Sequence, residues 1–550
     1  MQAVGPDVAS LSDLLFQLAR RFDEKPAFGH LGARISFADL DRLSRRFAAW
    51  VQRETDLQSG DRIVLQLPNL MQYPVLLFGA RRAGLVIVNA NPLLCAEELG
   101  CLLRDSGARA LVSFAPVPVE RLQILSASPI EYLITTEPGD LHPVPGRQLL
   151  NLFARFKAAG SGKGVRGGRV PPGIERVSFT AIMQLGAGRI WQPPEQSSEL
   201  ALLQYTGGTT GPAKGAMLSE RALLSNLVQL DALLSEYTTP GQERLLQPLP
   251  LYHIYSFTLT LLMLSIGAYI ELIPDPRHTR SLVRCWDRLE PTIMAGINPL
   301  FIHLCQQPEF QRLDFSSLKL TISGGMALTR SIAARWQKVT GGDICEGYGL
   351  TECSPVVSVN RPNTFRAGTV GKPLAGTDVR VLGEAGKLMP PGESGDIWVR
   401  GPQLMSGYWH QREETQGAMQ DGWLDTGDIG LIDSDGYLKI IDRRKEVINV
   451  SGFKVYPSEL EDVIACHPDI LECAVVGLPD SSGGEQIKLY VVPANQQLSI
   501  RQVRDYCRER LTAYKVPRSV EFCRSLPRTP IGKVSRRDLR EMALQGKRVH

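Results

Sequence analysis

The stretch YTGGTTGPAKG, Tyr205–Gly215, combines glycines, threonines and one lysine, which are residue types that can bind a phosphate. Exposed backbone N–H groups, hydroxyl donors and an ammonium can converge on one anion. The P-loop of nucleoside triphosphatases needs Gly-Lys followed by Ser or Thr, whereas Lys214 follows Ala213 and precedes Gly215. The stretch therefore predicts a phosphate loop of another kind, and composition alone leaves a loop without ligand open as the alternative.

Five further stretches place polar and aromatic residues among glycines and prolines. They are PLYHIY (Pro250–Tyr255), EGYGLTECSP (Glu346–Pro355), GWLDTGDIG (Gly422–Gly430), IIDRRKEVINVSGFKVYPSELE (Ile440–Glu461) and PRTPIGKVSRRDLR (Pro527–Arg540). With the first stretch, their order and spacing resemble the acyl-adenylate-forming superfamily, and within it the bacterial long-chain fatty-acyl-CoA synthetases. The resemblance extends over nearly the whole chain, and ordered motifs together are far more specific than any one.

The resemblance implies a ligase that activates a carboxylic acid in two steps. A carboxylate does not acylate a thiol at neutral pH because its oxygen is a poor leaving group, so it first attacks the α-phosphorus of ATP to give acyl-AMP. Coenzyme A then takes the acyl group and AMP leaves. The implied ligands are a medium- to long-chain fatty acid, ATP, Mg²⁺ and coenzyme A, and the protein mainly aligns and neutralises charge.

By the same resemblance, the first motif would bind the leaving phosphates and a nearby carboxylate would bind the metal. The phosphate contacts would be Thr206, Gly207, Gly208, Thr209, Thr210 and Lys214. Thr206 would also take part in catalysis. Glu352 would be the Mg²⁺ ligand and a catalytic residue, and Thr351 would contact the α-phosphate.

The resemblance assigns other residues to the nucleoside. Tyr348 would stack on adenine, and three glycines would allow a close approach of the ligand: Gly325, Gly347 and Gly349. Asp428 would accept hydrogen bonds from both ribose hydroxyls, and Arg443 would offer a donor fork. Taken singly, each of these charged residues would more often lie at an ordinary surface.

The last group of residues concerns catalysis and the second step. Lys533 would be a catalytic ammonium, and His253 would lie near the substrate carboxylate, although a lone histidine among apolar residues is usually part of the core. The resemblance further implies that the C-terminal domain rotates about Asp442. This rotation would bring three residues to the channel for coenzyme A: Ser451, Gly452 and Phe453.

The segment TLTLLMLSIG after Phe257 allows two interpretations. Its leucines either line a tunnel for the acyl chain or pack in the core, which is the commoner role of such a stripe. From Leu245 to Ile270 no residue except His253 can carry a charge, but Pro248, Pro250 and Gly267 interrupt the run. We therefore expect a buried loop, helix and strand here, not a membrane span.

Two rival functions stay open. One is an acyl-AMP ligase or adenylation enzyme that uses another carboxylic acid or a carrier-protein acceptor. The other, from a different class, is a fatty-acid-binding or uptake protein without catalysis. The presence of Lys533, Glu352 and Asp428 favours an enzyme.

Charge and cysteine usage indicate which partners and which cellular compartment to expect. The net charge is +4, but residues 501–550 hold 14 basic and 5 acidic residues, a local balance of +9 that suits a polyanion such as coenzyme A. No recognition motif accompanies these arginines, so nucleic acid is not an expected partner. The ten scattered cysteines and the N-terminus without signal-peptide features predict a cytoplasmic protein. Peripheral contact with the membrane's inner face and a dimer both stay open.

The elements that position these motifs follow from length and periodicity. With 550 residues, more than one domain is expected. A helix is predicted over 11–22 and strands over 62–68, 85–90 and 110–115, an alternation typical of layered, largely parallel α/β sheets. The Gly-rich interval 158–173 is expected to be an exposed connection.

The C-terminal part has a different pattern. Strands are predicted at 472–480 and 487–494, with a helix over 499–511 capped by Ser499 and a basic helix at the end. The sequence thus predicts a large α/β domain over 1–441 and a small, mobile α+β domain over 442–550, hinged near Asp442.

Overall fold

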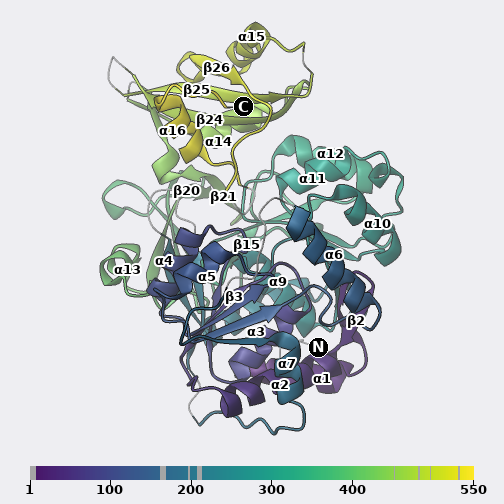
Figure 1. The fold of residues 1–550 in the computed structure, drawn as a ribbon. Coiled ribbons are helices and arrows are strands. Elements are labelled where there is room, and N and C mark those ends of the chain that lie inside the picture. The colour runs from purple at the N-terminus through teal and green to yellow at the C-terminus, as the bar shows by residue number, and fades with distance from the viewer. Residues whose placement is uncertain are drawn as a thin grey trace.

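The structure is a computed structural model that describes residues 8–160, 169–195, 198–206, 213–450, 452–480, 484–495, 497–529 and 533–549. Two α/β sheets lie side by side in the main body, residues 8–443, and the C-terminal unit, residues 444–549, sits on top of them (Figure 1). The arrangement matches the expected fold class. The division of the chain into domains at Asp442 remains a prediction.

At one edge, the first sheet ends in the two strands that flank the predicted phosphate loop. Its strands, in spatial order, are β7 (Glu175–Ser178), β6 (Tyr132–Thr136), β5 (Ala110–Phe114), β3 (Arg62–Gln66), β4 (Val86–Asn89), β8 (Leu200–Thr206) and β9 (Lys214–Ser219). All pairs are parallel except β8 with β9. The expected strands over 62–68, 85–90 and 110–115 are confirmed as β3, β4 and β5.

The second sheet is parallel through its centre and antiparallel at its edges. Its order is β16 (Lys372–Pro373), β15 (Val356–Val359), β14 (Ile344–Gly349), β13 (Leu320–Ser323), β12 (Ile293–Gly296), β10 (Arg244–Gln247), β11 (Tyr269–Leu272), β1 (Pro26–His30) and β2 (Ala33–Ser36). An antiparallel sheet follows it in the chain. This third sheet contains β17 (Asp378–Leu382), β18 (Gly395–Arg400), β20 (Trp423–Ile432) and β19 (Met419–Gln420), with β21 (Leu438–Arg443) paired to β20.

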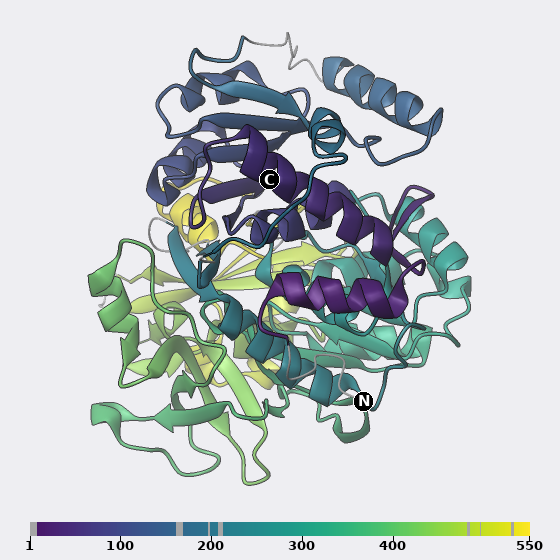
Figure 2. The same cartoon turned by 90° about the horizontal axis from the view of Figure 1, so that it is seen from below.

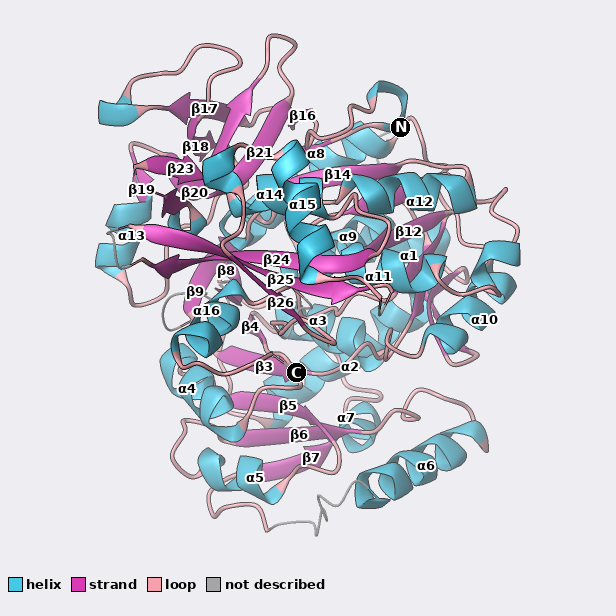
Figure 3. Ribbon diagram, turned by 90° about the horizontal axis from the view of Figure 1, so that it is seen from above, coloured by secondary structure: helices cyan, strands magenta, loops and turns pink. Residues whose placement is uncertain are grey.

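Helices of the main body cover both parallel sheets (Figures 1 and 3). They are α1 (Leu11–Phe22), α2 (Phe37–Glu54), α3 (Gln72–Arg82), α4 (Ala96–Ser106), α5 (Val119–Leu125), α6 (Gly146–Gly160), α7 (Phe179–Leu185), α8 (Glu220–Leu234), α9 (Ile254–Ser265), α10 (Thr279–Leu289), α11 (Asn298–Cys305), α12 (Arg330–Thr340) and α13 (Arg412–Ala418). The helix expected over 11–22 is confirmed as α1, whose Ser10 side chain accepts the first-turn N–H of Asp13.

The apolar run from Leu245 to Ile270 folds as expected into strand β10, a loop, helix α9 and strand β11. Helix α9 is apolar on all sides and lies in the main core, where Phe257 and the leucines that follow it are buried. This burial favours the packing interpretation of the leucine stripe. In the part of the chain that the structure describes, no helix has both the length and the apolar character needed to cross a bilayer.

The expectation for 158–173 is wrong at its beginning, because α6 continues to Gly160. Alanines 158 and 159 have the highest helix propensity and extend the helix where a connection was predicted. Residues 161–168 lie outside the described part of the chain.

The C-terminal unit builds small cores of its own. It contains the hairpin β22 (Ile448–Val450) and β23 (Phe453–Val455), the sheet β24 (Ile470–Pro479), β25 (Glu485–Pro493) and β26 (Ser519–Phe522), and the helices α14 (Pro457–Ile464), α15 (Ile500–Arg510) and α16 (Arg536–Leu544). The predicted cap holds, since the Ser499 side chain accepts the N–H of Gln502. Leu471 also packs against the core beside β12 and α12, so the unit contacts the main body.

Candidate active site

The site lies where strands β13 and β14 end, which is the edge at which parallel α/β sheets bind ligands. The turn after β13 contains Gly325, whose φ of +83° is the left-handed region that favours glycine. Gly349 ends β14, and a Cβ there would lie 2.0 Å from the carbonyl oxygen of Pro355. A Cβ on Gly347 would meet its neighbours at ordinary distances, the nearest at 3.5 Å. Packing against Pro355 therefore requires glycine at position 349, whether or not a ligand is bound.

Tyr348, Asp428 and Arg443 form one group, joined by a hydrogen bond and an ion pair. Asp428 in β20 is 3% exposed, and its Oδ2 accepts the Tyr348 hydroxyl at 2.6 Å. Its Oδ1 lies 3.0 Å from Nε of Arg443, the residue directly opposite in β21. Burial, together with the charge of Asp428, raises the pKa of Tyr348 well above its usual value, so the hydroxyl remains a donor. Free lone pairs on Asp428 still allow it to accept from a ligand.

Glu352 lies next to this group, in the short 3₁₀ turn η2 (Thr351–Cys353). Its Oε1 accepts the hydroxyl of Tyr408 at 2.7 Å, and its backbone oxygen accepts the N–H of Met405 at 2.8 Å. Burial and the nearby Glu352 charge raise the pKa of Tyr408, which keeps its hydroxyl protonated. Among the described residues, no group of three or more His, Cys, Asp and Glu side chains could hold a metal ion by itself.

Tyr408 also lies beside strand β9, which follows the predicted phosphate loop. The ammonium of Lys214 lies 5.2 Å from the centre of the Tyr408 ring, and it pairs with Glu414 in α13. Thr206 ends β8 directly opposite Lys214, and its hydroxyl donates to the Lys214 carbonyl at 3.3 Å. The structure thus brings Thr206, Lys214 and Glu352 to one region. The predicted phosphate contacts Gly207, Gly208, Thr209 and Thr210 lie outside the described residues.

An open cavity of about 450 Å³ adjoins this region. It is lined by Lys214, Tyr408, Glu413, Glu414, Gly417, Ala418, Asp425, Thr426, Gly427 and Arg444. Neither Tyr408 nor Glu414 was anticipated from the sequence. The only sequence signal was an aromatic residue after Gly407, which is too common to indicate a site.

Lys533 reaches this edge from the C-terminal unit. Its Cε lies 4.0 Å from where a Cβ on Gly325 would be, so the lysine stem passes over the glycine turn after β13. The Thr529 N–H donates to the Lys533 carbonyl at 2.7 Å, and an isolated bridge pairs Arg528 with Val534. Burial, with a contribution from the nearby Arg443, lowers the pKa of Lys533 to about 8, and the charge of Asp428 opposes that shift.

His253 lies on the same side of the sheet. It caps α9, and its Nδ1 accepts the N–H of Tyr255 at 3.3 Å. Burial, and then the charge of Lys533, lower the pKa of His253 to about 4, so its imidazole is neutral at pH 7. The histidine therefore combines a structural role as a helix cap with a position close to Lys533.

The residues expected to serve the second step lie elsewhere. Gly452 has a φ of +88° in the turn between β22 and β23. The ring of Phe453 is 56% exposed and stacks on Tyr514, also in the C-terminal unit, at 4.7 Å between centres. Ser451 is outside the described residues. In this conformation the structure brings Lys533 to the main-body site and leaves Phe453 at the surface.

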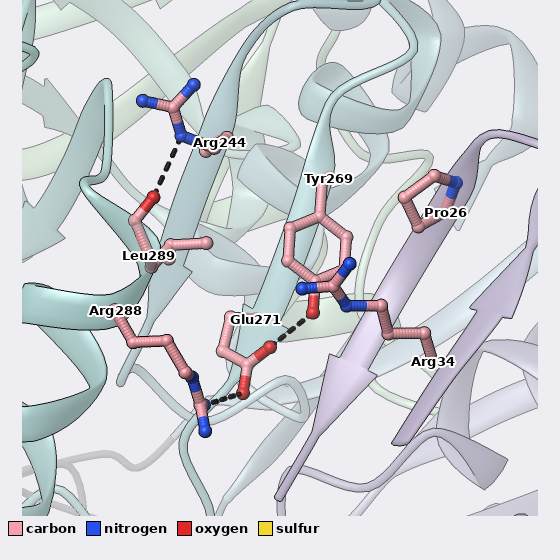
Figure 4. A pocket seen from close by; sticks show the side chains of 7 residues that line it. All are labelled: Pro26, Arg34, Arg244, Tyr269, Glu271, Arg288 and Leu289. Atoms are coloured by element: carbon pink, nitrogen blue, oxygen red, sulfur yellow. Dashed lines mark hydrogen bonds and ion pairs between the residues drawn. The ribbon is translucent and has the colours of Figure 1, made fainter. Parts of the chain in front are cut away.

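A smaller cavity of about 240 Å³ lies at the amino ends of β10 and β11 (Figure 4). Three guanidinium groups approach it, but Arg288 already binds Glu271 at 3.1 Å and Arg244 donates to the Leu289 carbonyl at 2.9 Å. The glutamate in turn accepts the hydroxyl of Tyr269. Since two of its three arginines are engaged and it lies at the opposite strand ends, this cavity is not the candidate site.

Comparison with known families shows which family the chain belongs to. The pattern of the family described as "AMP-binding enzyme" matches residues 15–409, and that of the "AMP-binding enzyme C-terminal domain" matches residues 459–533.

The chain belongs to the AMP-binding enzyme family.

Curated relatives of this AMP-binding enzyme match along almost its full length. The long-chain-fatty-acid–CoA ligase of Salmonella typhimurium is 41% identical over 547 residues, covering 98% of this chain and 96% of the relative. The Bacillus subtilis enzyme of the same name is 34% identical, covering 97% and 94%. A feruloyl-CoA synthase from an Amycolatopsis species is 31% identical, covering 95% and 96%.

Solved structures give the same fold. The anthranilate CoA ligase AuaEII in complex with anthranoyl-AMP aligns with a TM-score of 0.83 at 26% identity, covering 99% of both chains. ATP-bound MatB from Rhodopseudomonas palustris aligns with a TM-score of 0.77 at 28% identity, covering 96% of this chain and 98% of the other. The fold class and the superfamily expected from the motifs are therefore confirmed.

Proposed function

We propose that this AMP-binding enzyme is a fatty acid–CoA ligase. In the first step a fatty-acid carboxylate oxygen attacks the α-phosphorus of ATP, and pyrophosphate leaves to give acyl-AMP. In the second step the thiol sulfur of coenzyme A attacks the acyl carbon, its proton is lost to solvent, and AMP leaves. The substrate class follows the printed names of the full-length relatives.

The observation that carries the proposal is the approach of Lys533 to the Gly325 turn, beside Asp428 and Arg443. An ammonium here would stabilise the negative charge that develops as pyrophosphate departs. Tyr348 and Asp428 would hold the nucleoside, while Thr206, Lys214 and the glycine loop would hold the leaving phosphates. His253, neutral at pH 7, would face the carboxylate of the fatty acid without adding charge.

The residues also fit Mg²⁺. This ion usually takes one or two protein carboxylates and completes its shell with substrate phosphates and water, so a single carboxylate such as Glu352 is sufficient. When bound, Mg²⁺ would neutralise phosphate charge. Glu352 is already oriented for this purpose by the Tyr408 hydroxyl.

We further propose that residues 442–550 rotate about Asp442 between the two steps. In this structure Lys533 lies at the main-body site while Phe453 is exposed at the surface. These positions support a domain arrangement suited to the first step. Rotation would withdraw Lys533 and carry Ser451, Gly452 and Phe453 toward the site for coenzyme A. We place the reaction in the cytoplasm, where ATP and coenzyme A are available.

An alternative substrate has its own support. Feruloyl-CoA synthase is among the relatives, and anthranilate CoA ligase is among the similar structures. Aromatic acids are therefore the alternative substrate class. The test is thioester formation with ATP and coenzyme A across acids from acetate to oleate, with ferulate and anthranilate included. Fatty acids should be preferred and AMP should be the product. A preference for an aromatic acid, for a carrier-protein acceptor, or release of ADP would contradict the proposal.

A further inference from the structure

Helix α6 exposes an apolar stripe to solvent. Its exposed apolar residues recur at positions i, i+3, i+4 and i+7, which places them on one face of a helix. They are Leu149 at 64% exposed, Leu152 at 52%, Phe153 at 68% and Phe156 at 68%. Val144, directly before the helix, is also exposed, at 67%. Large apolar side chains grouped in this way on a surface mark an interaction site.

The other side of α6, where Arg147, Leu150, Asn151 and Ala154 are partly buried, is held against the protein by polar contacts. Asn151 Oδ1 accepts the N–H of Gly139 at 2.7 Å, and one turn later Arg155 forms two hydrogen bonds with Glu137, at 2.7 and 2.9 Å. One turn earlier, the backbone of Arg147 lies so close to Gly139 that a Cβ there would be 2.6 Å from the Arg147 oxygen. The helix is thus inverted relative to an ordinary surface helix, which turns its apolar face inward.

The position of α6 leaves this stripe free to meet a flat surface. Seen from below and from above, the helix lies at the periphery of the molecule, beyond the sheet edge formed by β6 and β7 (Figures 2 and 3). No substrate contact proposed above involves it. A planar partner could approach the stripe without meeting the active site.

Charge indicates which partner fits. The sequence of α6, GRQLLNLFARFKAAG, contains two arginines and one lysine and no acidic residue, and of these Arg155 is paired with Glu137. A helix with a phenylalanine- and leucine-rich face and basic flanks is typical of those that lie in the interface of an anionic bilayer. We propose that α6 is the membrane-docking element of this protein and that its partner is an anionic lipid surface. That the surface also supplies the fatty acid rests on the proposed function, whereas the docking itself does not.

The experiment is flotation of the full chain with vesicles of phosphatidylglycerol and phosphatidylcholine in roughly equal amounts. The test variant is Phe153→Ser/Phe156→Ser. Both phenylalanines would be buried in the bilayer when the helix is bound, so replacing them should weaken vesicle binding by roughly tenfold or more. The matched control is Leu388→Ser/Leu544→Ser, which removes exposed leucines from other parts of the surface and should bind as the wild type does. Binding should weaken on phosphatidylcholine alone and at high salt.

Two further readouts separate the alternatives. Thioester formation from octanoate without vesicles should be equal in all these proteins, so a failed docking test is distinct from a failed function. Light scattering gives the oligomeric state of each. The proposal is overturned if the wild type does not float with anionic vesicles or if the test variant floats equally well. It is also overturned if the variant only converts a dimer to a monomer, since the stripe would then contact a second copy.

Discussion

Asp428 and Lys533 face the same site from two differently built regions. Asp428 belongs to the main body and is buried in β20, where it accepts a hydrogen bond from Tyr348 of another sheet and pairs with Arg443 of the neighbouring strand β21. Lys533 belongs to the C-terminal unit and sits in a loop held by the Thr529–Lys533 hydrogen bond and the Arg528–Val534 bridge. The proposed nucleotide contacts thus lie on strands of the main body, while the proposed catalytic ammonium comes from the C-terminal unit, which we propose to rotate. Variants on each side should affect different half-reactions.

The largest effect is expected from Lys533→Ala. Removing the ammonium should slow acyl-AMP formation by ~10³-fold, because a stabilising charge at the transition state is lost. Conversion of supplied acyl-AMP and coenzyme A to thioester should be almost unchanged. Pyrophosphate release measures the first step and thioester formation the second. Lys547→Ala, which removes an exposed lysine of the same unit, should have no effect. Near-normal pyrophosphate release in Lys533→Ala would remove the lysine from the mechanism.

A slightly smaller loss is expected from Glu352→Gln. The amide keeps an acceptor for the Tyr408 hydroxyl but loses the charge that would bind Mg²⁺. Adenylation should fall by ~10²–10³-fold, and the Mg²⁺ concentration for half-maximal rate should rise. Glu384→Gln, at an exposed position, serves as the control. An unchanged Mg²⁺ requirement would show that Glu352 is not the metal ligand.

Substitution at Asp442 should affect the other half-reaction. Its buried carboxylate accepts the N–H groups of Ser458 at 2.7 Å and Arg443 at 2.8 Å, which fixes the chain where the two regions join. Proline would lock φ near −65°. If this adds ~3 kcal/mol to the rotated arrangement, Asp442→Pro should slow thioester formation from acyl-AMP by ~10²-fold and leave adenylation intact.

Asp442→Ala is the matched control for that prediction. It removes the carboxylate contacts but leaves φ free, so it should retain most of the thioester-forming activity. Circular dichroism should show that both variants are folded. Equal loss of both half-reactions in Asp442→Pro would argue for a single fixed arrangement.

The smallest effect concerns the contact between the two regions. Burial raises the pKa of Glu346 to about 8, with a further rise from Asp462 of the C-terminal unit, against a lowering by the Leu328 N–H. Because the folded-state pKa is raised, the stabilising contribution is complete below the ordinary pKa of 4.5 and is lost as pH rises through about 8. Glu346→Gln should therefore lose less thermal stability than the wild type between about pH 5 and about pH 9.

Thermal unfolding at several pH values checks this expectation. Glu393→Gln, which changes an exposed glutamate, should follow the wild type throughout. Parallel pH profiles for the wild type and Glu346→Gln would contradict the shifted pKa of Glu346.

Much of the fold followed from local patterns. Helix α1 spans the predicted residues because its apolar spacing and the Ser10 cap are both local. The same holds for α15 and its Ser499 cap. The end of α6 was mispredicted because glycines beyond it were taken to set the boundary, whereas the alanines before them continue the helix.

The site was predictable as a set of residues but not as a geometry. Motif order predicted Tyr348, Glu352, Asp428 and Lys533 as site residues, yet no local pattern indicated that Tyr408 binds Glu352 from 56 positions away. The pairing of Tyr348 with Asp428 spans 80 positions and depends on two different sheets meeting. Such contacts arise from packing, which local sequence does not encode.

The sequence by itself determined the order of the motifs, the two-step chemistry they imply, and the periodicity that forms each helix. Tertiary structure alone decided which of these groups meet and which way each helix faces. In α6, the spacing of Leu149, Phe153 and Phe156 predicts an amphipathic helix in either orientation. Bonds of Asn151 and Arg155 to residues 137–140 help to hold the helix so that its apolar stripe faces solvent. Periodicity is a property of neighbouring residues, whereas orientation depends on distant partners.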